Sequence, residues 1–225
     1  TITVTIKDVN DNAPVFTNNT SFPLSENETF VTELVTTDAD TNPTVTYSIT
    51  GGADASSFAV TEAGVLTING TDYESGKTDY EVIVTANDGV NATDATFRLT
   101  IEDVNDNAPV FTSDSTFTID ENTTTVTTLV TTDADTNPTV TYSITGGADA
   151  SSFALTNDGV LTISGTDYES GKTSYELIVT ANDGINTTDQ TISVAINDLN
   201  DEAPVFGIGT NAFTVDENKT EVGSV

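Results

Sequence analysis

Apolar and polar residues alternate along the chain in short runs, and these runs recur at a constant distance. Positions 97, 99 and 101 are apolar between polar neighbours, as are 192, 194 and 196 and, at the start of the chain, 2, 4 and 6. Alternation with a period of two predicts half-buried β-strands, because successive side chains of a strand point to opposite faces. The offset of 95 residues (192 − 97) is the size of a small domain.

Further alternating runs lie inside each repeat. They cover 44–49, 66–68 and 80–84 in the first repeat, and 139–144, 161–163 and 175–179 in the second. Turn signals such as Gly51-Gly52 and Asp88-Gly89 separate the runs, and we find no sustained helical periodicity. About seven short strands rich in Thr and Val therefore predict that each repeat is an all-β, antiparallel β-sandwich.

One nonapeptide marks the joints between repeats. Residues 103–111 read Asp-Val-Asn-Asp-Asn-Ala-Pro-Val-Phe, residues 8–16 are identical, and residues 198–206 differ only at Leu199 and Glu202. This spacing predicts complete repeats at 13–107 and 108–202. Residues 1–12 are expected to be the last strand and linker of a preceding repeat, and residues 203–225 the start of a following one, so we expect the chain to be part of a longer protein.

Composition excludes several classes of function. The chain has no Cys and no His, which removes disulfides, thiolate chemistry and the commonest general base, so we do not expect an enzyme. Its formal net charge of −31 opposes binding to nucleic acid and to anionic membrane surfaces. No apolar run approaches the roughly 20 residues that span a bilayer.

Acidic residues recur in register near the joints. The pairs related by 95 residues are Glu26 and Glu121, Asp38 and Asp133, Asp40 and Asp135, Asp72 and Asp167, Glu74 and Glu169, and Asp88 and Asp183. Asp in loops also forms Asx-turns, but several carboxylates in one place repel one another unless a cation such as Ca²⁺ lies among them. An EF-hand does not fit, because the twelfth residue counted from Asp8 is Asn19 where a bidentate Glu is required.

Five motifs, which together cover essentially the whole chain, resemble those of a cadherin ectodomain. The nonapeptide is similar to the cadherin inter-repeat linker. The other motifs are Ser25-Glu26-Asn27 and Asp120-Glu121-Asn122, Asp38-Ala39-Asp40 and Asp133-Ala134-Asp135, Asp72-Tyr73-Glu74 and Asp167-Tyr168-Glu169, and Ala86-Asn87-Asp88-Gly89 and Ala181-Asn182-Asp183-Gly184. Tyr73 and Tyr168 replace the usual Arg. The resemblance implies seven-stranded Greek-key sandwiches of immunoglobulin-like form, joined end to end in an extended rod.

The resemblance also implies three Ca²⁺ ions at a complete joint, and only the middle joint has both flanks in this chain. The first ion would be held by Glu26, Asp72, Glu74 and Asp106. The second would share Glu26, Glu74 and Asp106 and add Asp103, the Val104 carbonyl and Asp135. The third would use Asn105, the Asn107 carbonyl, Asp133, Asp135, Asp183 and the Asn137 carbonyl.

The outer joints are expected to hold fewer ions. The N-terminal one would have only the third type of site, from Asn10, the Asn12 carbonyl, Asp38, Asp40, Asp88 and the Asn42 carbonyl. The C-terminal one would hold the first ion and the second from Glu121, Asp167, Glu169, Asp198, the Leu199 carbonyl and Asp201. Glu202 replaces the usual Asn there, which the backbone ligand of the family tolerates.

The resemblance implies a calcium-dependent adhesion or tether segment of a large extracellular, cell-surface protein that binds other cadherins, homophilic contacts included. A carbohydrate- or surface-binding module of a cadherin-like microbial adhesin is the alternative, which clustered exposed aromatic residues would favour. Several Asn-x-Ser/Thr triplets would accept glycans in a secreted glycoprotein, including those that begin at Asn27, Asn69, Asn91, Asn122 and Asn186.

Overall fold

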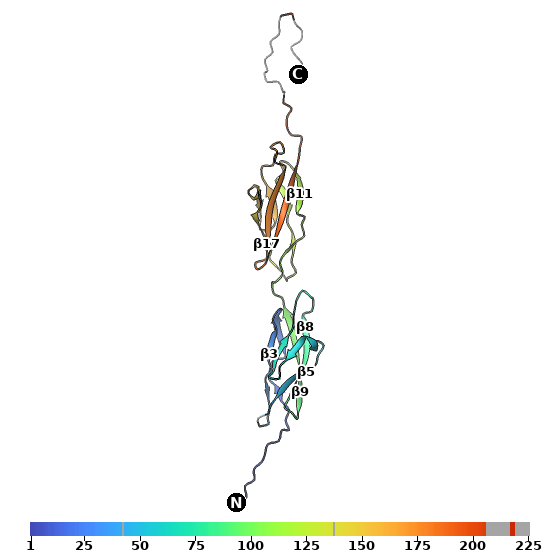
Figure 1. Ribbon diagram of the computed structural model, residues 1–225, viewed down its shortest axis with the longest axis vertical. Coiled ribbons are helices and arrows are strands. Elements are labelled where there is room, and N and C mark those ends of the chain that lie inside the picture. Colours follow the sequence, from blue (N-terminus) through green and yellow to red (C-terminus); the bar gives the residue numbers. More distant parts are fainter. Residues whose placement is uncertain (42, 137, 206–216, 219–225) are drawn as a thin grey trace. The chain divides into compact units, whose positions relative to one another are not determined.

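The first repeat folds into a β-sandwich, as predicted (Figure 1). The computed structural model describes residues 1–41, 43–136, 138–205 and 217–218, so Asn42 and Asn137 lie outside the described residues. The strands described in this repeat are β1 (Val15–Phe16), β2 (Ser21–Ser25), β3 (Phe30–Glu33), β4 (Thr36–Thr37), β5 (Thr46–Gly51), β6 (Phe58–Val60), β7 (Val65–Ile68), β8 (Asp79–Asn87) and β9 (Ala92–Glu102), with the short 3₁₀ helix η1 (Ala55–Ser57).

These strands form two layers. One sheet has the order β2-β9-β8-β5, the other has β3-β7-β6, and β1 pairs separately with β4. The pair β2–β9 is parallel, whereas β9–β8 and β8–β5 are antiparallel. The segment 15–25 thus changes sheets between β1 and β2, and the segment 30–37 is interrupted between β3 and β4. Counting each segment as one strand gives the predicted seven, although the parallel pair was not predicted.

Alternating residues of facing strands form the core. Along β9 the inward side chains are Phe97, Leu99 and Ile101, which are at most 2% exposed, while their neighbours face solvent. They pack with Leu66 and Ile68 of the other layer in one cluster. Each fully buried side chain of this size stabilises the fold by about 1.5–3 kcal/mol, so the core needs no disulfide.

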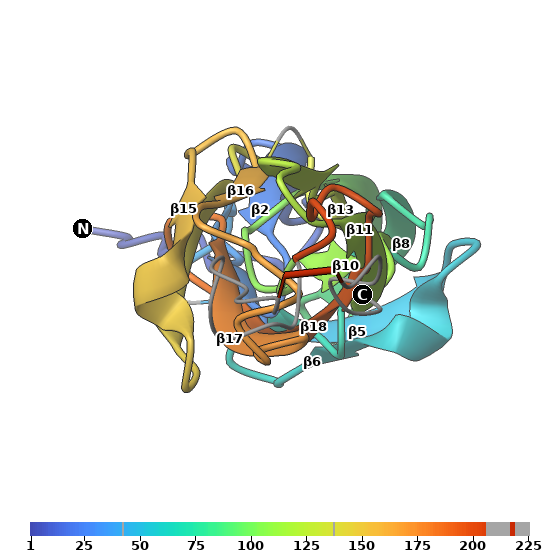
Figure 2. The same ribbon diagram turned by 90° about the horizontal axis from the view of Figure 1, so that it is seen from above.

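The second repeat has the same order of elements. They are β10 (Val110–Phe111), β11 (Thr116–Asp120), β12 (Thr125–Thr128), β13 (Thr131–Thr132), β14 (Thr141–Gly146), η2 (Ala150–Ser152), β15 (Phe153–Leu155), β16 (Val160–Ile163), β17 (Ser174–Asn182) and β18 (Thr187–Asn197). One sheet has the order β11-β18-β17-β14 and the other β12-β16-β15. Figure 2 shows β15 beside β16 in one sheet and β17 beside β18 in the other.

The strand expected at residues 1–6, as the last strand of a preceding repeat, is not formed in this structure and stays a prediction. No strand is assigned among residues 1–12, and Ile2, Val4 and Ile6 are 80–92% exposed. The identical alternation at 97–101 does form a strand, because β9 has β2 and β8 as partners there. Alternation marks a segment that is able to enter a sheet, but a strand also needs a neighbour to accept its backbone hydrogen bonds.

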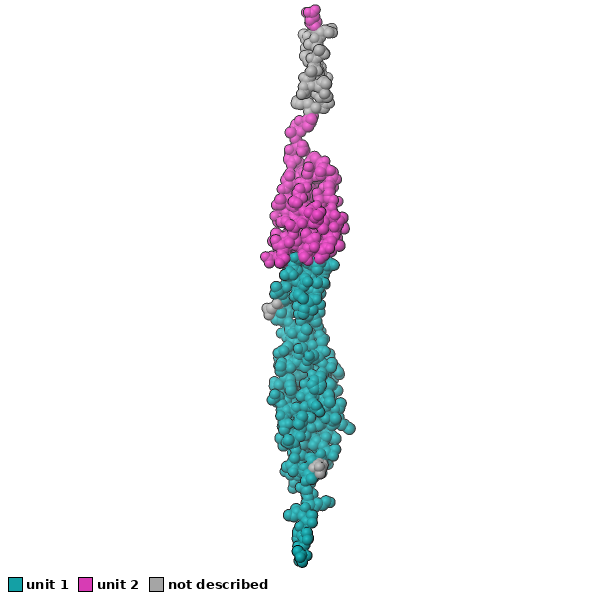
Figure 3. Space-filling model, turned by 90° about the vertical axis from the view of Figure 1, so that its left-hand side faces the viewer, with its two compact units in different colours: residues 1–113, 130–142, 180–189 teal, residues 114–129, 143–179, 190–225 magenta. Residues whose placement is uncertain are grey.

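Contacts between residues divide the chain into two compact units (Figure 3). Unit 1 comprises residues 1–113, 130–142 and 180–189, and unit 2 comprises residues 114–129, 143–179 and 190–225. Unit 1 therefore contains the linker 103–107 together with two loops of the second repeat, those around Asp135 and Asp183. The boundaries 13–107 and 108–202 follow from sequence spacing and stay predictions.

Candidate metal centre

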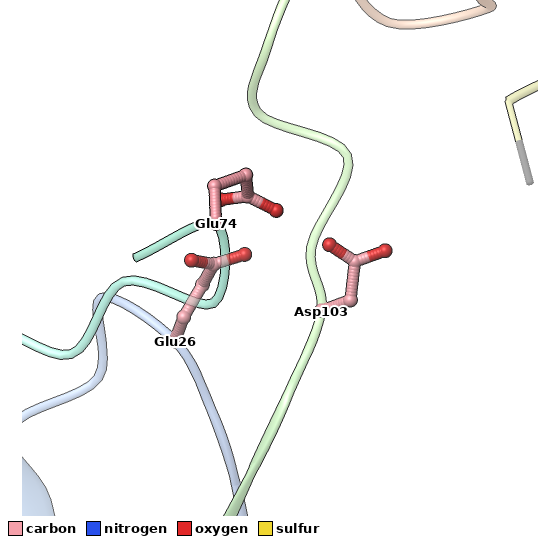
Figure 4. Close-up of side chains that lie close together, drawn as sticks. All are labelled: Glu26, Glu74 and Asp103. Carbon is pink, nitrogen blue, oxygen red and sulfur yellow. The ribbon is translucent and has the colours of Figure 1, made fainter. Parts of the chain in front are cut away.

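Glu26 anchors a group of three carboxylates in unit 1. It follows β2, where Asn27 adopts a left-handed conformation (φ 63°), and only 3% of its surface is exposed. One carboxylate oxygen accepts the N–H of Tyr73 at 2.6 Å and the other accepts the N–H of Val104 at 2.9 Å. Oxygen atoms of Glu26, Glu74 and Asp103 lie within 4.8 Å of one another, and Figure 4 shows the three carboxylates converging. Three like charges are thereby held in a small volume.

Several carboxylate oxygens, in this group and in the two groups of Asp38 and Asp133 described below, are buried without a hydrogen-bond partner. They belong to Asp38, Glu74, Asp103 and Asp133. Burial raises the pKa of Glu74, and the neighbouring Asp103 and Glu26 raise it further. A buried, unpaired carboxylate oxygen is costly, so each one is a position where a cation would relieve both the desolvation and the repulsion.

Two further groups adjoin the first one. Oxygens of Glu74, Asp106 and Asp135 form one group, and oxygens of Asp133, Asp135 and Asp183 form the other, each within 4.8 Å. Asp135 belongs to both groups and Glu74 belongs to the first and second, so the three groups share ligands in a chain. Asp135 is 5% exposed and Asp183 is 8% exposed.

The turn between β17 and β18 holds Asp183 ionised. One oxygen of Asp183 accepts the N–H groups of Ile185 and Asn186, each at 2.7 Å. Burial raises the pKa of Asp183, but these N–H donors outweigh it and lower the pKa below its usual value. An ionised carboxylate with a second oxygen directed away from the turn is suited to bind a cation.

Asp72 lies beside the first group. With Glu26, Asn27, Glu74, Asp106 and Asn107 it lines a cavity of about 240 Å³. Its own oxygen accepts the N–H of Ser75 at 3.1 Å. Of the residues predicted for the first ion, the structure therefore brings Glu26, Asp72, Glu74 and Asp106 around one polar cavity.

The linker contributes both side chains and backbone. The amide of Asn107 donates to Asp106 at 2.8 Å and to Asp135 at 2.9 Å. Asp103 accepts the N–H of Thr136 at 2.7 Å, which ties the linker to the loop carrying Asp133 and Asp135. Val104 takes part through its N–H, while no contact of its carbonyl with the group is recorded among the described residues.

The N-terminal joint repeats part of this arrangement. Oxygens of Asp38, Asp40 and Asp88 lie within 4.8 Å of one another. Asn12 donates its backbone N–H and its amide to Asp40, and the amide of Asn10 lies near Asp88. The N–H of Asn91 lowers the pKa of Asp88. The predicted residues 10, 12, 38, 40 and 88 are thus brought together, and Asn42 is outside the described residues.

The C-terminal joint repeats the first group. Oxygens of Glu121, Glu169 and Asp198 lie within 4.8 Å, all in unit 2. Glu121 accepts the N–H of Tyr168 at 2.7 Å and that of Leu199 at 2.8 Å. Asp201 accepts the amide of Asn122 at 2.8 Å, and its N–H donates to the Leu199 carbonyl. Asp167 accepts the N–H of Ser170, and no contact that would place it in the group is recorded for the described residues.

Sequence reasoning missed the asparagine amides that hold the carboxylates in place. Asn27 donates to Asp106 at 2.6 Å, and Asn186 donates to the Asn107 carbonyl at 2.9 Å. Of the candidate glycan acceptors named above, Asn27, Asn91, Asn122 and Asn186 are engaged in this way, whereas Asn69 lies exposed in the β7–β8 loop. The signal available in the sequence was that each of these four Asn residues lies at the same distance along the chain from a copy of the linker. Glycan attachment stays a prediction.

The donor set fits a hard cation. All the candidate ligands offer oxygen, from carboxylates, amides and backbone carbonyls, which is the chemistry that Ca²⁺ prefers. The chain has no His or Cys to offer the nitrogen and sulfur ligands typical of zinc sites. Among the described residues, no helix has the length and apolar character needed to cross a membrane.

Comparisons with known proteins agree on one family. The model of the cadherin domain matches residues 115–197. Protocadherin Fat 1 of Homo sapiens is 33% identical over 97% of this chain, and Cadherin-23 of Mus musculus is 34% identical over 90%. The chain spans only 5% and 7% of these two relatives. The crystal structure of human Protocadherin-24 EC1-2 superposes with a TM-score of 0.70 at 25% identity, covering 85% of this chain and all of that one.

Proposed function

Since the chain belongs to the cadherin family, we propose that it is a calcium-dependent adhesion or tether segment whose joints stiffen when Ca²⁺ binds. Cadherins are adhesion proteins and not enzymes, so the expectation that this chain has no catalytic role is confirmed. The relatives consist of tandem repeats of the same sandwich at the cell surface, and we place this chain in such an extracellular setting.

The observation that carries the proposal is the set of buried carboxylate oxygens without partners. Glu74, Asp103 and Asp133 each have one, in adjoining groups that share Glu74 and Asp135. A fold that gained nothing from a cation would satisfy these atoms with N–H or O–H groups. Their convergence at three neighbouring points supports three ions at the middle joint.

The proposed assignment of ligands follows the three groups. Glu26, Asp72, Glu74 and Asp106 surround the first ion; Glu26, Glu74, Asp103, Asp106, Asp135 and the Val104 carbonyl the second; Asn105, Asp133, Asp135, Asp183 and the carbonyls of Asn107 and Asn137 the third. These sets contain eight carboxylates, which three ions with six positive charges nearly neutralise. The outer joints would bind fewer ions through the residues described above.

Stiffening follows from where the ligands come from. Glu26 and Glu74 belong to loops of the first sandwich, Asp133 and Asp183 belong to loops of the second repeat, and the linker lies among them. Without ions the carboxylates repel one another, and with ions each metal becomes a cross-link between segments distant in sequence. Calcium would therefore convert a flexible connection into a rigid one.

A calcium titration with small-angle X-ray scattering tests this function. We expect the maximum dimension to become sharply defined as calcium saturates the chain, and to broaden after chelation while circular dichroism still reports folded sandwiches. The same scattering profile with and without calcium would refute the proposed stiffening. Isothermal calorimetry on the same sample gives the number of ions and shows separately whether any bind.

The carbohydrate-binding alternative receives little support. Most aromatic side chains lie in the interior, with Phe58, Tyr80 and Phe97 at most 7% exposed. Phe16 and Tyr47 pack against each other at the core edge, 6.1 Å between ring centroids. An exposed group of rings on which a sugar would stack is not found among the described residues, so adhesion through other cadherins is the function we favour.

A further inference from the structure

Asn186 lies at the point where the turn of the second sandwich meets the linker. Its backbone N–H donates to Asp183 at 2.7 Å, and its carbonyl accepts the N–H of Asp183 at 3.2 Å. Its side-chain amide donates in the opposite direction, to the Asn107 carbonyl at 2.9 Å and to Asn105 Oδ1 at 3.1 Å. One residue thus connects a carboxylate and two linker oxygens, all three of which are proposed ligands of the third ion.

The two possible orientations of the Asn105 amide, related by a turn of 180°, would have opposite consequences for the site. In the first, Oδ1 faces the carboxylates of Asp135 and Asp183 and accepts the hydrogen bond from Asn186. In the second, turned by 180°, Nδ2 donates to Asp135 at 3.2 Å and to Asp183 at 3.1 Å, but it then lies 3.1 Å from Nδ2 of Asn186. Two amide nitrogens that face each other are both donors, so Asn186 disfavours the turned form.

Only the first orientation suits a cation. An amide oxygen directed at two carboxylates repels them unless a positive ion lies among the three, whereas the turned amide donates hydrogen bonds to the carboxylates and offers the ion no oxygen. We propose that Asn186 is a positioning residue for the third ion: it keeps the Asn105 oxygen turned toward the site and fixes the Asn107 carbonyl beside it. This role rests on the calcium binding proposed above.

The N-terminal joint contains the same device. Asn91 donates its backbone N–H to Asp88 at 2.7 Å and its amide to the Asn12 carbonyl at 2.9 Å and to Asn10 Oδ1 at 3.4 Å. Asn10 likewise has a turned orientation that donates to Asp88 and Asp40. The contact between Asn91 and Asn10 is longer, so Asn91 should hold the orientation of the Asn10 amide less strongly than Asn186 holds that of Asn105.

The test compares Asn186→Ala with two matched variants. Asn91→Ala removes the same amide at the other joint. Asn182→Ala removes a side chain of the same turn, which accepts the N–H of Gly184 at 2.6 Å and has no recorded contact with the linker. Calcium affinity is measured by calorimetry, and the side-chain NH₂ resonances of Asn105 are followed by NMR with and without calcium.

For Asn186→Ala we expect a loss of about tenfold in affinity at one class of site, in the range found when partners of metal ligands are removed. In the calcium-free state the Asn105 NH₂ resonances should shift, because the amide turns toward Asp135 and Asp183. Asn91→Ala should leave the Asn105 resonances unchanged, and Asn182→Ala should leave both measurements unchanged.

Unaltered Asn105 resonances in calcium-free Asn186→Ala would overturn the positioning role, even if the wild type bound no calcium at all. Equal losses of affinity in Asn186→Ala and Asn182→Ala would also overturn it, since the effect would then come from the turn as a whole. Absence of calcium binding to the wild type would instead count against the proposed function, because the NMR measurement judges the amide contact independently.

Discussion

Glu26 illustrates how a single side chain combines two tasks. Its carboxylate accepts the N–H groups of Tyr73 and Val104, which orients the loop before Glu74 and the start of the linker. The same carboxylate faces Glu74 and Asp103 within 4.8 Å. The hydrogen bonds favour the folded site in any solution, whereas the crowding of charges favours it only when a cation is present.

Replacing Glu26 with Gln should therefore have a large effect in the presence of calcium and a small one in chelator. With calcium, one ligand charge is lost at two shared sites, and we expect the calcium concentration at half-saturation to rise by at least about tenfold, or ~1.4 kcal/mol. In chelator the lost acceptor and the relieved repulsion offset each other, so the melting temperature should change little. Calorimetric titration and thermal unfolding on one sample measure both effects.

Glu121→Gln is the matched control, because Glu121 accepts the equivalent two N–H groups, those of Tyr168 and Leu199, at the C-terminal joint. It should leave the middle sites unchanged. A large drop in the chelator melting temperature of Glu26→Gln would contradict the balance described above and would show that Glu26 acts mainly as a structural acceptor.

At the scale of residues, sequence spacing pointed to the carboxylates that the structure groups together, but not to the amides that contact them. Asp133 and Asp183, singled out because they recur in register, lie with Asp135 in one group, while their role as cation ligands stays a proposal. Asn27 and Asn186 also occur in glycosylation triplets and in turns, and the only sign in the sequence that their amides reach the linker is their constant offset from the linker copies. The contribution of Asn107 was predicted through its carbonyl only, yet its amide joins Asp106 to Asp135.

At the scale of elements, the approach of the loop after β5 to β8 depends on Gly52. Its φ is 104°, and a Cβ built there would lie 2.6 Å from the carbonyl oxygen of Glu81 and from the Cα of Val82. Backbone atoms in the middle of a strand have no room to move away. Gly52→Ala should therefore lower the free energy of unfolding of the first sandwich by about 3 kcal/mol, measured by urea denaturation.

Gly89→Ala separates the two contributions to that effect. Gly89 has a similar φ of 97°, but no atom lies within 4 Å of its built Cβ. Backbone strain alone should lower the free energy of unfolding by about 1 kcal/mol. Equal effects of the two substitutions would show that the contact with β8 is unimportant.

The same loop is held to β8 by Asp54, and this contact predicts a dependence on pH. Asp54 binds Lys77 Nζ at 2.8 Å and accepts the N–H of Glu81 at 2.9 Å. Lys77 and then the Glu81 N–H lower the pKa of Asp54 in the folded chain. Because the folded pKa is the lower one, the stabilisation is present above the unfolded pKa and is lost as pH falls through the folded pKa.

Asp54→Asn should accordingly lower the free energy of unfolding by about 1 kcal/mol at pH 7, allowing for the half-exposed Lys77. The difference from the wild type should shrink as pH falls through the lowered pKa of folded Asp54, where the wild-type carboxylate also becomes protonated. Urea denaturation at pH 7 and at lower pH measures this. A difference that stays constant with pH would assign the effect to packing and not to charge.

Strands with a partner on each side were the easiest elements to predict, and β9 and β18 are examples. Their long alternation of exposed and buried residues is visible in the sequence because one face of each strand meets the core. The division of the segment 15–25 between two sheets was not visible, because β1 has two residues and the choice between β4 and β9 as partner depends on tertiary packing. The alternation at residues 1–6 likewise does not specify a partner, and no strand is assigned there.

At the scale of the whole molecule, Asp135 is the residue that couples the second and third of the proposed ion sites. Its oxygens belong to the group with Glu74 and Asp106 and to the group with Asp133 and Asp183. Loss of its charge should weaken two of the three ions, whereas loss of Asp133 affects one. The net charge of −31 adds a general repulsion in the folded chain, which the proposed bound ions would reduce.

Differential scanning calorimetry of Asp135→Asn tests this coupling. In calcium the wild type should unfold at a temperature raised by ligand binding, since ions that bind only the folded state stabilise it by mass action, about 2.7 kcal/mol at a hundredfold excess over the dissociation constant. Asp135→Asn should lose most of this rise and resemble the wild type in chelator. Asp40→Asn removes the equivalent charge at the N-terminal joint, where Asp40 belongs to the group with Asp38 and Asp88, and should lose less. If both variants lost the same share of the calcium effect, the middle joint would have no special role, and the ions would act on each sandwich separately.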